Sequence, residues 1–317
     1  MGIMRAMRFG FWLDTSNSFE HMRRVCEVAE AAGWDGIWAP DHFMPPPEGY
    51  PMKTDYPDGE PELGDVNEAW VLIAALAATV PRVRLGHLVL GNTYRHPAVT
   101  AKMAATVDRL SGGRFVLGLG AAWQENEHRR YGIGYGTVAE RADRLEEACQ
   151  IIASMFANQR TDFAGRYYQL DGAPLAPKPV GHLPLLIGGA GERRTIPTAA
   201  RYADEWNTWG GPDRLIQKMA VLDRACDTVG RDPATVQRSA ALLVDIRDFA
   251  ATPAERARGL ARPHALVVGT VAQITETLAE YQAAGVDEVV IPDFNWTAAE
   301  TPDLLQRVAA EIIPHFR

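Results

Sequence analysis

The sequence predicts a closed barrel of eight parallel strands, each followed by a helix, the (β/α)8 or TIM-barrel class of α/β fold. Strand-like and helix-like segments alternate along almost the whole chain, which is typical of a parallel sheet with crossover helices. The 317 residues suit such a barrel, and 47% of them are hydrophobic, enough for a large core. We expect one domain over 1–317, with an open doubly wound sheet as the alternative.

The first half of the chain contains four strand–helix pairs. Each expected strand is a short apolar run such as RFGFWLD, and each expected helix carries apolar residues at a helical spacing. The first and third helices run into glycines, which commonly end helices. The strands are expected at 8–14, 35–40, 83–91 and 114–120, and the helices at 19–33, 67–80, 96–113 and 137–157.

Four more strands follow in the second half. They are LPLLIGG, DEWNTWG, VQRSAALLVDI and VDEVVIPDF, and the helical segments after them begin near residues 192, 213, 271 and 302. Function in such a barrel gathers where the strands end and the following loops begin. Three long connections, 41–67, 121–137 and 158–183, are therefore expected to be functional loops.

The composition excludes several kinds of partner. The formal net charge is −8 and there is no basic block, so neither nucleic acid nor an anionic membrane is expected to bind. No apolar run approaches the roughly 18 residues of a membrane span, and the first residues lack the apolar segment of a signal peptide. Cys26, Cys149 and Cys226 form no CxxC motif, which indicates reduced, helix-buried thiols. We expect a cytoplasmic protein.

A carboxylate and an imidazole, Asp41 and His42, stand together where the second strand ends. Charged residues are common at such strand ends, so the pair alone does not indicate chemistry. At the mouth of a barrel, opposite a possible anion site, a catalytic or cofactor role for His42 is favoured. The three prolines that follow are expected to begin a loop that covers the substrate.

The turn GGAGERR follows the fifth strand and precedes a helix expected to begin at Glu192. Glycines let backbone amides approach a ligand, and the first amides of a helix attract anions, so the turn can cradle a phosphate or carboxylate. The alternative is a tight turn that needs glycine only for its backbone angles. Arg193 and Arg194 favour the anion site, whereas Glu192 slightly opposes it.

Tryptophans recur at the strand ends, at positions 12, 123, 209 and 296. Each of them is as typical of the core as of a binding site, but several at one barrel face would suit a flat heteroaromatic ligand. The segment GLGAAW begins like a dinucleotide-binding fingerprint, but Trp123 takes the place of its third glycine. We therefore reject that fingerprint.

Metal and covalent catalysis have little support in the sequence. The first strand ends in FWLDTS without a pair of histidines, and no HExxH motif is present. There is no GxSxG motif and no cysteine at a strand end, so a covalent acyl mechanism has no nucleophile. We expect no metal.

Four stretches of the sequence resemble the bacterial luciferase-like family. They are GWDGIWAPDHF, LGHLVLGNTYRHPAVTAKMAATVDRLSGGRFVLGLGAAWQENEHRRYG, PLLIGGAGERRT…AARYADEWNT and VGTVAQITETLAEYQAAGVDEVV. The likeness extends from about residue 8 to 292, and its most specific part is 85–132. It is closest to the branch of the family that depends on coenzyme F420, a deazaflavin.

The resemblance implies a luciferase-like barrel with inserted loops at its C-terminal face and a flavin-like ring bound at that mouth. Asp41 and His42 would face the reactive carbon C5, with the imidazole donating a proton or stabilising the reduced ring. A non-prolyl cis peptide would join Leu88 and Val89 beneath the ring. The positions implied to bind the cofactor are Asp41, Leu88, Val89, Gly120, Ala121, Ala122, Gly188, Gly189, Ala190, Gly191 and Glu192.

The sequence departs from the family pattern at two positions. Ala121 stands where the FMN-binding luciferases place an arginine for the phosphate, which favours the deazaflavin over FMN. Trp123 stands where the sugar-phosphate dehydrogenases of the F420 branch place a catalytic glutamate, so that chemistry requires Glu125 or Glu127 instead. Trp12, Trp123 and Trp209 are then expected to line a pocket for a more apolar or aromatic substrate.

The resulting hypothesis is an F420-dependent oxidoreductase that moves a hydride between the deazaflavin and a small organic substrate, with His42, Asp41 and Glu127 as its catalytic residues. An FMN-dependent monooxygenase is the alternative, and a non-catalytic flavin-binding protein is a third possibility. By analogy with the family, we also expect a homodimer, formed through the apolar helices after the second and third strands.

Overall fold

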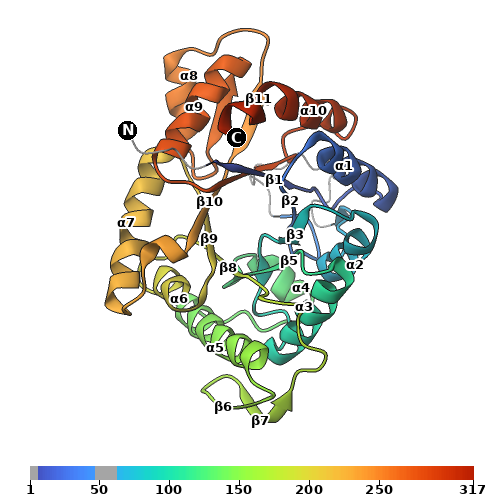
Figure 1. Cartoon of the computed structure of the whole chain (residues 1–317), viewed down its shortest axis with the longest axis vertical. Coiled ribbons are helices and arrows are strands. Elements are labelled where there is room, and N and C mark those ends of the chain that lie inside the picture. The colour runs from blue at the N-terminus through green and yellow to red at the C-terminus, as the bar shows by residue number, and fades with distance from the viewer. Residues whose placement is uncertain (1–5, 47–62) are drawn as a thin grey trace.

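The computed structural model describes residues 6–46 and 63–317 as a barrel of parallel strands inside a ring of helices (Figure 1). The predicted (β/α)8 fold is confirmed, and all eight expected strands are present. They are β1 (Arg8–Trp12), β2 (Gly36–Ala39), β3 (Arg84–His87), β5 (Phe115–Gly120), β8 (Leu185–Gly188), β9 (Glu205–Trp209), β10 (Gln237–Ala241) and β13 (Glu288–Pro292).

The sheet closes on itself. The strand order is β3-β2-β1-β13-β10-β9-β8-β5, and the further pairing of β3 with β5 joins the two ends. All these pairs are parallel, so the carboxyl ends of the eight strands meet at one rim. Parallel neighbours require crossover connections, and the helices supply them on the outside of the barrel.

The outer ring contains the helices expected from the sequence. They are α1 (Phe19–Ala32), α2 (Ala69–Thr79), α3 (Pro97–Ser111), α5 (Val138–Ala157), α6 (Thr195–Tyr202), α7 (Pro212–Thr228), α9 (Val271–Ala283) and α10 (Thr301–Glu311). Ser18 caps the start of α1 by accepting the amide of His21, and Gly33 ends it with φ of 96°. In the part of the chain that is described, no helix is long and apolar enough to cross a membrane.

Two expected strands are interrupted. The strand expected at 83–91 divides at the peptide bond between Leu88 and Val89, which is cis, and continues as β4 (Leu90–Gly91). Both β3 and β4 pair with β5, so Leu88 and Val89 form a bulge in the barrel wall. The strand expected at 236–246 divides into β10 and β11 (Leu243–Ile246), because β11 leaves the barrel sheet to pair with β12 (Leu266–Gly269).

The long connections contain more structure than the sequence indicated. Residues 158–183 include an antiparallel hairpin of β6 (Arg160–Ala164) and β7 (Gln169–Pro174), which projects beyond α5 (Figure 1). Residues 121–137 include α4 (Glu125–Arg130), and α8 (Pro253–Leu260) was not expected. Of the first long connection, residues 47–62 lie outside the described residues, including one of the three prolines.

The helix expected at Glu192 begins three residues later, at Thr195, so that prediction was wrong. The amide of Ile196 donates to the Gly191 carbonyl across a wider turn, and the first regular helical bond runs from Thr198 to Arg194. Gly189, with φ of 131°, turns the chain before the helix can start.

Hydrophobic side chains fill two layers of core. One lies between the strands and the helices, where Phe9 contacts Trp34 and Phe316. The other fills the inside of the barrel and includes Trp38, Val116 and Val290. The three cysteines are free and buried on α1, α5 and α7, as expected.

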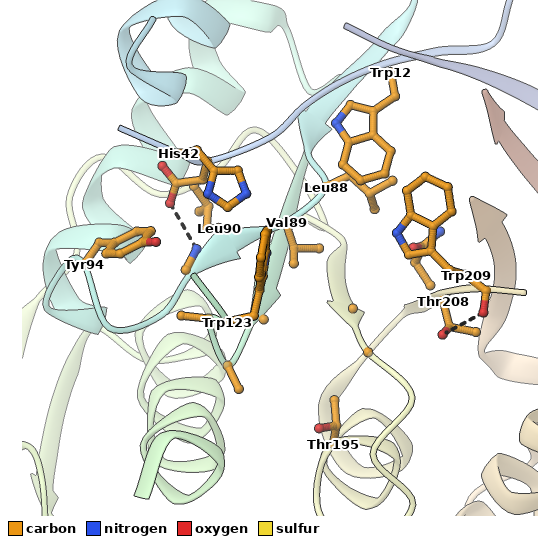
Figure 2. Close-up of a pocket in the computed structure, with 18 residues that line it drawn as sticks. Trp12, His42, Leu88, Val89, Leu90, Tyr94, Trp123, Thr195, Thr208 and Trp209 are labelled. Atoms are coloured by element: carbon orange, nitrogen blue, oxygen red, sulfur yellow. Dashed lines mark hydrogen bonds between the residues drawn. The ribbon is translucent and has the colours of Figure 1, made fainter. Parts of the chain in front are cut away.

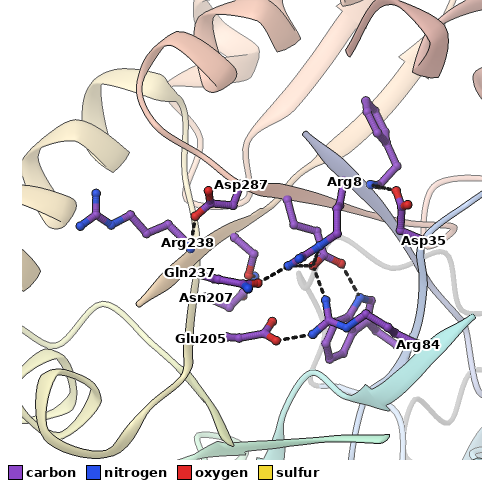
Figure 3. Close-up of polar contacts among 12 residues, drawn as sticks. Arg8, Asp35, Arg84, Glu205, Asn207, Gln237, Arg238 and Asp287 are labelled. Carbon is purple, nitrogen blue, oxygen red and sulfur yellow. Dashed lines mark hydrogen bonds and ion pairs between the residues drawn. The ribbon is translucent and has the colours of Figure 1, made fainter. Parts of the chain in front are cut away.

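Polar side chains close the amino end of the barrel (Figure 3). Arg8, Arg84, Glu205, Gln237 and Glu288 are each the first residue of their strand. The fully buried carboxylate of Glu288 accepts hydrogen bonds from both arginines, at 3.2 Å, and from the indole of Trp38, at 3.1 Å. Arg84 also pairs with Glu205. Burial raises the pKa of Glu205, and Arg84 offsets part of that rise.

We predict that Glu288→Gln lowers the free energy of unfolding by about 3 kcal/mol, because it leaves two arginines at the end of the barrel without their shared counter-charge. Denaturant unfolding measures the loss. The control is Glu311→Gln, which removes an exposed ion pair with Arg307 and should cost about 0.5 kcal/mol or less. Equal effects of the two changes would contradict the proposed role of this cluster.

Candidate active site

A cavity of about 290 Å³ opens at the carboxyl ends of the strands. Function is expected at this end of the barrel in this fold. The Glu288 cluster closes the opposite end. Most of the positions predicted from the sequence line it together (Figure 2). They are Trp12, Asp41, His42, Leu88, Val89, Gly120, Ala121, Ala122, Trp123, Gly188, Gly189 and Trp209.

Four predicted positions do not line this cavity: Ala190, Gly191, Glu192 and Glu127. Glu192 is exposed and forms an ion pair with Lys218, at 2.7 Å. The amide of Gly189 donates to the carbonyl of Asn207 within the sheet, so this amide is not part of the predicted anion cradle.

The sequence analysis missed six residues of the lining. They are Leu90, Gly91, Tyr94, Thr195, Asn207 and Thr208. All but Thr195 lie in strand-end segments that the strand pattern had already located. Thr195 was missed because the start of its helix was misplaced, and its side chain points from the first turn of α6 toward the cavity (Figure 2).

The floor of the cavity is the bulge at Val89. The side chain of Val89 lies between Gly120, at the end of β5, and Gly188, at the end of β8. A Cβ atom at Gly120 would come within 2.6 Å of Val89, and one at Gly188 within 2.8 Å. Because neither position has room for a side chain, the floor stays low enough for a flat ligand to lie on it.

Aromatic rings form the walls. Trp12 and Trp209 contact each other with ring centroids 5.5 Å apart. Trp123 approaches His42 edge to face, at 5.4 Å, and in Figure 2 its indole stands edge-on beside Val89. Ala122 has φ of 63°, a sharp turn of the chain directly before Trp123. Trp296 is buried in the outer core and lines neither wall.

His42 is held by a buried carboxylate. Its Nδ1 lies 2.9 Å from Oε1 of Glu127, whose side chain is completely buried. The amide of Phe43 and the hydroxyl of Tyr94 also donate to Glu127. An ionised carboxylate only accepts hydrogen bonds, so the proton of this contact lies on Nδ1, and Nε2 is the ring nitrogen that Glu127 leaves unoccupied. Burial raises the pKa of Tyr94, and the carboxylate of Glu127 raises it further.

Asp41 binds an arginine, Arg95, and not the adjacent His42. Both of its carboxylate oxygens bind Arg95, at 2.7 and 3.0 Å, and one also accepts the amide of Gly91. Burial raises the pKa of Asp41, and the guanidinium of Arg95 offsets part of that rise. The carboxylate thus fixes the segment after β4, and no hydrogen bond joins Asp41 to His42 among those found in the described residues.

The fold and the site together define a (β/α)8 barrel protein whose strand-end cavity suits a flat heteroaromatic ligand. Residues 1–265 match the sequence profile of the luciferase-like monooxygenases, and the chain belongs to that family. The predicted family membership is confirmed.

Curated relatives support the same placement. A Mycobacterium tuberculosis protein named only as uncharacterised is 31% identical over 71% of this chain and 77% of its own length. The F420-dependent hydroxymycolic acid dehydrogenase of that organism is 30% identical, over 70% of this chain and 58% of its own. An F420-dependent glucose-6-phosphate dehydrogenase of Microbacterium testaceum is 31% identical, over 64% of this chain and 57% of its own length. The chain thus matches a little over half the length of these two dehydrogenases, and the resemblance to the F420-dependent branch is confirmed.

Solved structures share the fold. An F420-dependent secondary alcohol dehydrogenase in complex with an F420–acetone adduct has a TM-score of 0.81 at 19% identity, over 99% of this chain and 100% of its own. The F420-dependent tetrahydromethanopterin reductase of Methanopyrus kandleri has a TM-score of 0.79 at 16% identity, with the same coverage. At such low identities the likeness concerns the fold.

Proposed function

We propose that this protein is an oxidoreductase that uses coenzyme F420 and transfers a hydride between C5 of the deazaflavin ring and a small organic substrate. The proposal rests on the position of His42, which Glu127 holds at the edge of a flat-floored cavity. The named relatives, which are F420-dependent dehydrogenases, support the choice of cofactor.

The lining fits a deazaflavin ring. Leu88 and Val89 offer an apolar floor, and Gly120 and Gly188 keep it accessible. Within 6–46 and 63–317, no lysine or arginine lines the cavity, and Ala121 occupies the position where the FMN-binding luciferases place an arginine. When bound, the deazaflavin supplies a carbon that accepts or donates a hydride.

The proposed roles of the polar residues differ from those expected. His42 transfers the proton at Nε2, since Glu127 occupies Nδ1. Glu127 lies behind His42 and not in the cavity, so we assign it a positioning role instead of the catalytic one. Asp41, bound by Arg95, orders the cavity edge. Trp12, Trp123 and Trp209 line the space for the substrate.

The remaining expectations stay predictions: a single domain over 1–317, a cytoplasmic location and a homodimer. Exposed apolar side chains on the two helices after the second and third strands support the dimer. Val71 on α2 is 73% exposed, and Val99 and Leu110 on α3 are more than half exposed. A monomeric mass in light scattering would exclude this dimer.

Titration of the purified protein with F420 and with FMN tests the cofactor. We expect saturable F420 binding, measured by the fluorescence of the deazaflavin, and affinity for FMN at least about tenfold lower, because the FMN phosphate finds no arginine at position 121. Tighter binding of FMN than of F420 would refute the proposal.

A double-mutant comparison tests the link between Glu127 and His42. His42→Ala and Glu127→Gln should each lower kcat at least about tenfold, with little change in KM or F420 affinity, because both disturb proton transfer. The double variant should be no slower than His42→Ala, since Glu127 acts only through His42. Additive losses would show that Glu127 acts on its own. Glu125→Gln, a change in the same helix outside the cavity lining, is the control.

A further inference from the structure

Tyr94 shares an acceptor atom with His42. The hydroxyl of Tyr94 and Nδ1 of His42 both bind Oε1 of Glu127. The other oxygen of this carboxylate accepts the amide of Phe43, at 2.9 Å. Because two donors on one oxygen divide its negative charge between them, the charge that acts on His42 depends on Tyr94.

Tyr94 keeps its proton in the folded protein. Burial raises the pKa of Tyr94, and the charge of Glu127 raises it further. An ionised carboxylate offers no hydrogen, so the hydroxyl donates to Glu127 throughout the pH range in which a histidine takes up a proton.

Packing fixes the ring of Tyr94. The ring lies against Phe43 and His128, and in both contacts the ring centroids are 4.7 Å apart. Gly91 makes room for it on a further side, because a Cβ atom there would come within 2.4 Å of the Tyr94 ring. In Figure 2 the hydroxyl lies at the end of the ring nearer His42. The donor is therefore held at Glu127 by packing as well as by its hydrogen bond.

His128 supports this ring and is itself held at both nitrogens. It is completely buried, with Nδ1 at 2.7 Å from the carbonyl of Gln124 and Nε2 at 2.6 Å from the hydroxyl of Thr93. A carbonyl only accepts, so Nδ1 carries the proton and Nε2 of the neutral ring accepts from Thr93. Burial lowers the pKa of His128, which favours this neutral ring.

The other charged groups around His42 are not bound to its ring. Asp41 is bound by Arg95, which also pairs with Glu68. Tyr94→Phe alters none of these charges, so its effect on His42 isolates the hydrogen bond to Glu127. The titratable and charged groups that face His42 are Glu127 and His128 on α4, Asp41 and Arg95 beside it, and Asp14 and Asp65, which line a smaller cavity that His42 also borders.

We propose that Tyr94 is a positioning residue whose hydroxyl sets how tightly His42 and Glu127 together bind a proton. By taking part of the charge of Glu127, the hydroxyl disfavours the imidazolium form of His42 and favours the neutral ring. In the proton uptake, Nε2 of His42 gains one proton, Nδ1 keeps its own, and the Tyr94 O–H bond stays intact. This inference deepens the proposed function and rests on it only for the use that the enzyme makes of the proton.

An NMR titration of the protein labelled with nitrogen-15 in its histidine rings tests the inference without cofactor or turnover. The signals of His42 are those lost in His42→Gln. We expect the midpoint pH of these signals to rise by about 0.5–1 unit in Tyr94→Phe, because the imidazolium then meets the undivided charge of Glu127. A structural role alone would leave the midpoint in place.

Tyr131→Phe is the matched control. The hydroxyl of Tyr131 donates to the carbonyl of Phe43, at 2.9 Å, and not to Glu127. We expect this variant to titrate as the wild type does. An unchanged midpoint in Tyr94→Phe, or an equal rise in Tyr131→Phe, would overturn the inference.

Glu127→Gln tests the route of the effect. In this background, Tyr94→Phe should no longer shift the midpoint of His42, because the carboxylate that connects the two residues is gone. A shift of the same size in both backgrounds would show that Tyr94 does not act through Glu127. Failure of the protein to bind F420 would refute the proposed function and leave these titrations unaffected.

Replacement of the tyrosines by 3-fluorotyrosine decides the case should Tyr94→Phe fail to fold. The fluorinated hydroxyl is a stronger donor, so it should take more of the charge of Glu127 and lower the midpoint of His42. The same lowering is expected in Tyr131→Phe, which keeps the Tyr94 contact. An unchanged or higher midpoint would overturn the inference.

Discussion

The buried carboxylate of Glu127 holds the candidate active site together. It lies on α4, and it accepts hydrogen bonds from three donors on two other segments: His42 and Phe43 after β2, and Tyr94 after β4. A buried carboxylate without these donors would be strongly destabilising, so the three segments are constrained to one arrangement. The direction of the His42 ring follows from that constraint. Asp41 provides a second restraint of the same kind, because its pair with Arg95 connects the end of β2 to the segment after β4.

The two ends of the barrel serve different purposes. At the amino end, the first residues of five strands form a hydrogen-bonded cluster around Glu288, and Trp38 fills the space above Gly10. At the carboxyl end, Gly120 and Gly188 remove side chains from the same interior, and the cavity remains. A closed parallel barrel permits this division, because all the strands point the same way. Changes at the amino end are thus expected to affect stability, and changes at the carboxyl end to affect function.

The sequence pattern predicted the strands, and together with the family resemblance it predicted most of the cavity lining, because strand ends meet at one rim in this fold. It could not predict the partners of individual side chains. Asp41 and His42 are adjacent in sequence but bind Arg95 and Glu127, which lie on segments far along the chain. The cis bond at Leu88 was implied only by the family resemblance, since no local pattern indicates it. The start of α6 was misplaced because Glu192 is a common residue of a first helical turn, whereas its carboxylate binds Lys218 instead.

His42 lines both the main cavity and a smaller cavity of about 30 Å³ beside it, so the proposed proton transfer and the choice of substrate would depend on different segments. The segment after β2 carries the imidazole, and the donors that hold Glu127 orient it irrespective of the substrate. The small cavity is built largely from other segments, with Trp12 and Asp14 after β1 and Phe294 after β13. Substitutions in these two segments can therefore alter which substrate fits without moving the histidine. Relatives named for substrates as different as a sugar phosphate and a hydroxymycolic acid indicate that barrels of this family accept different substrates.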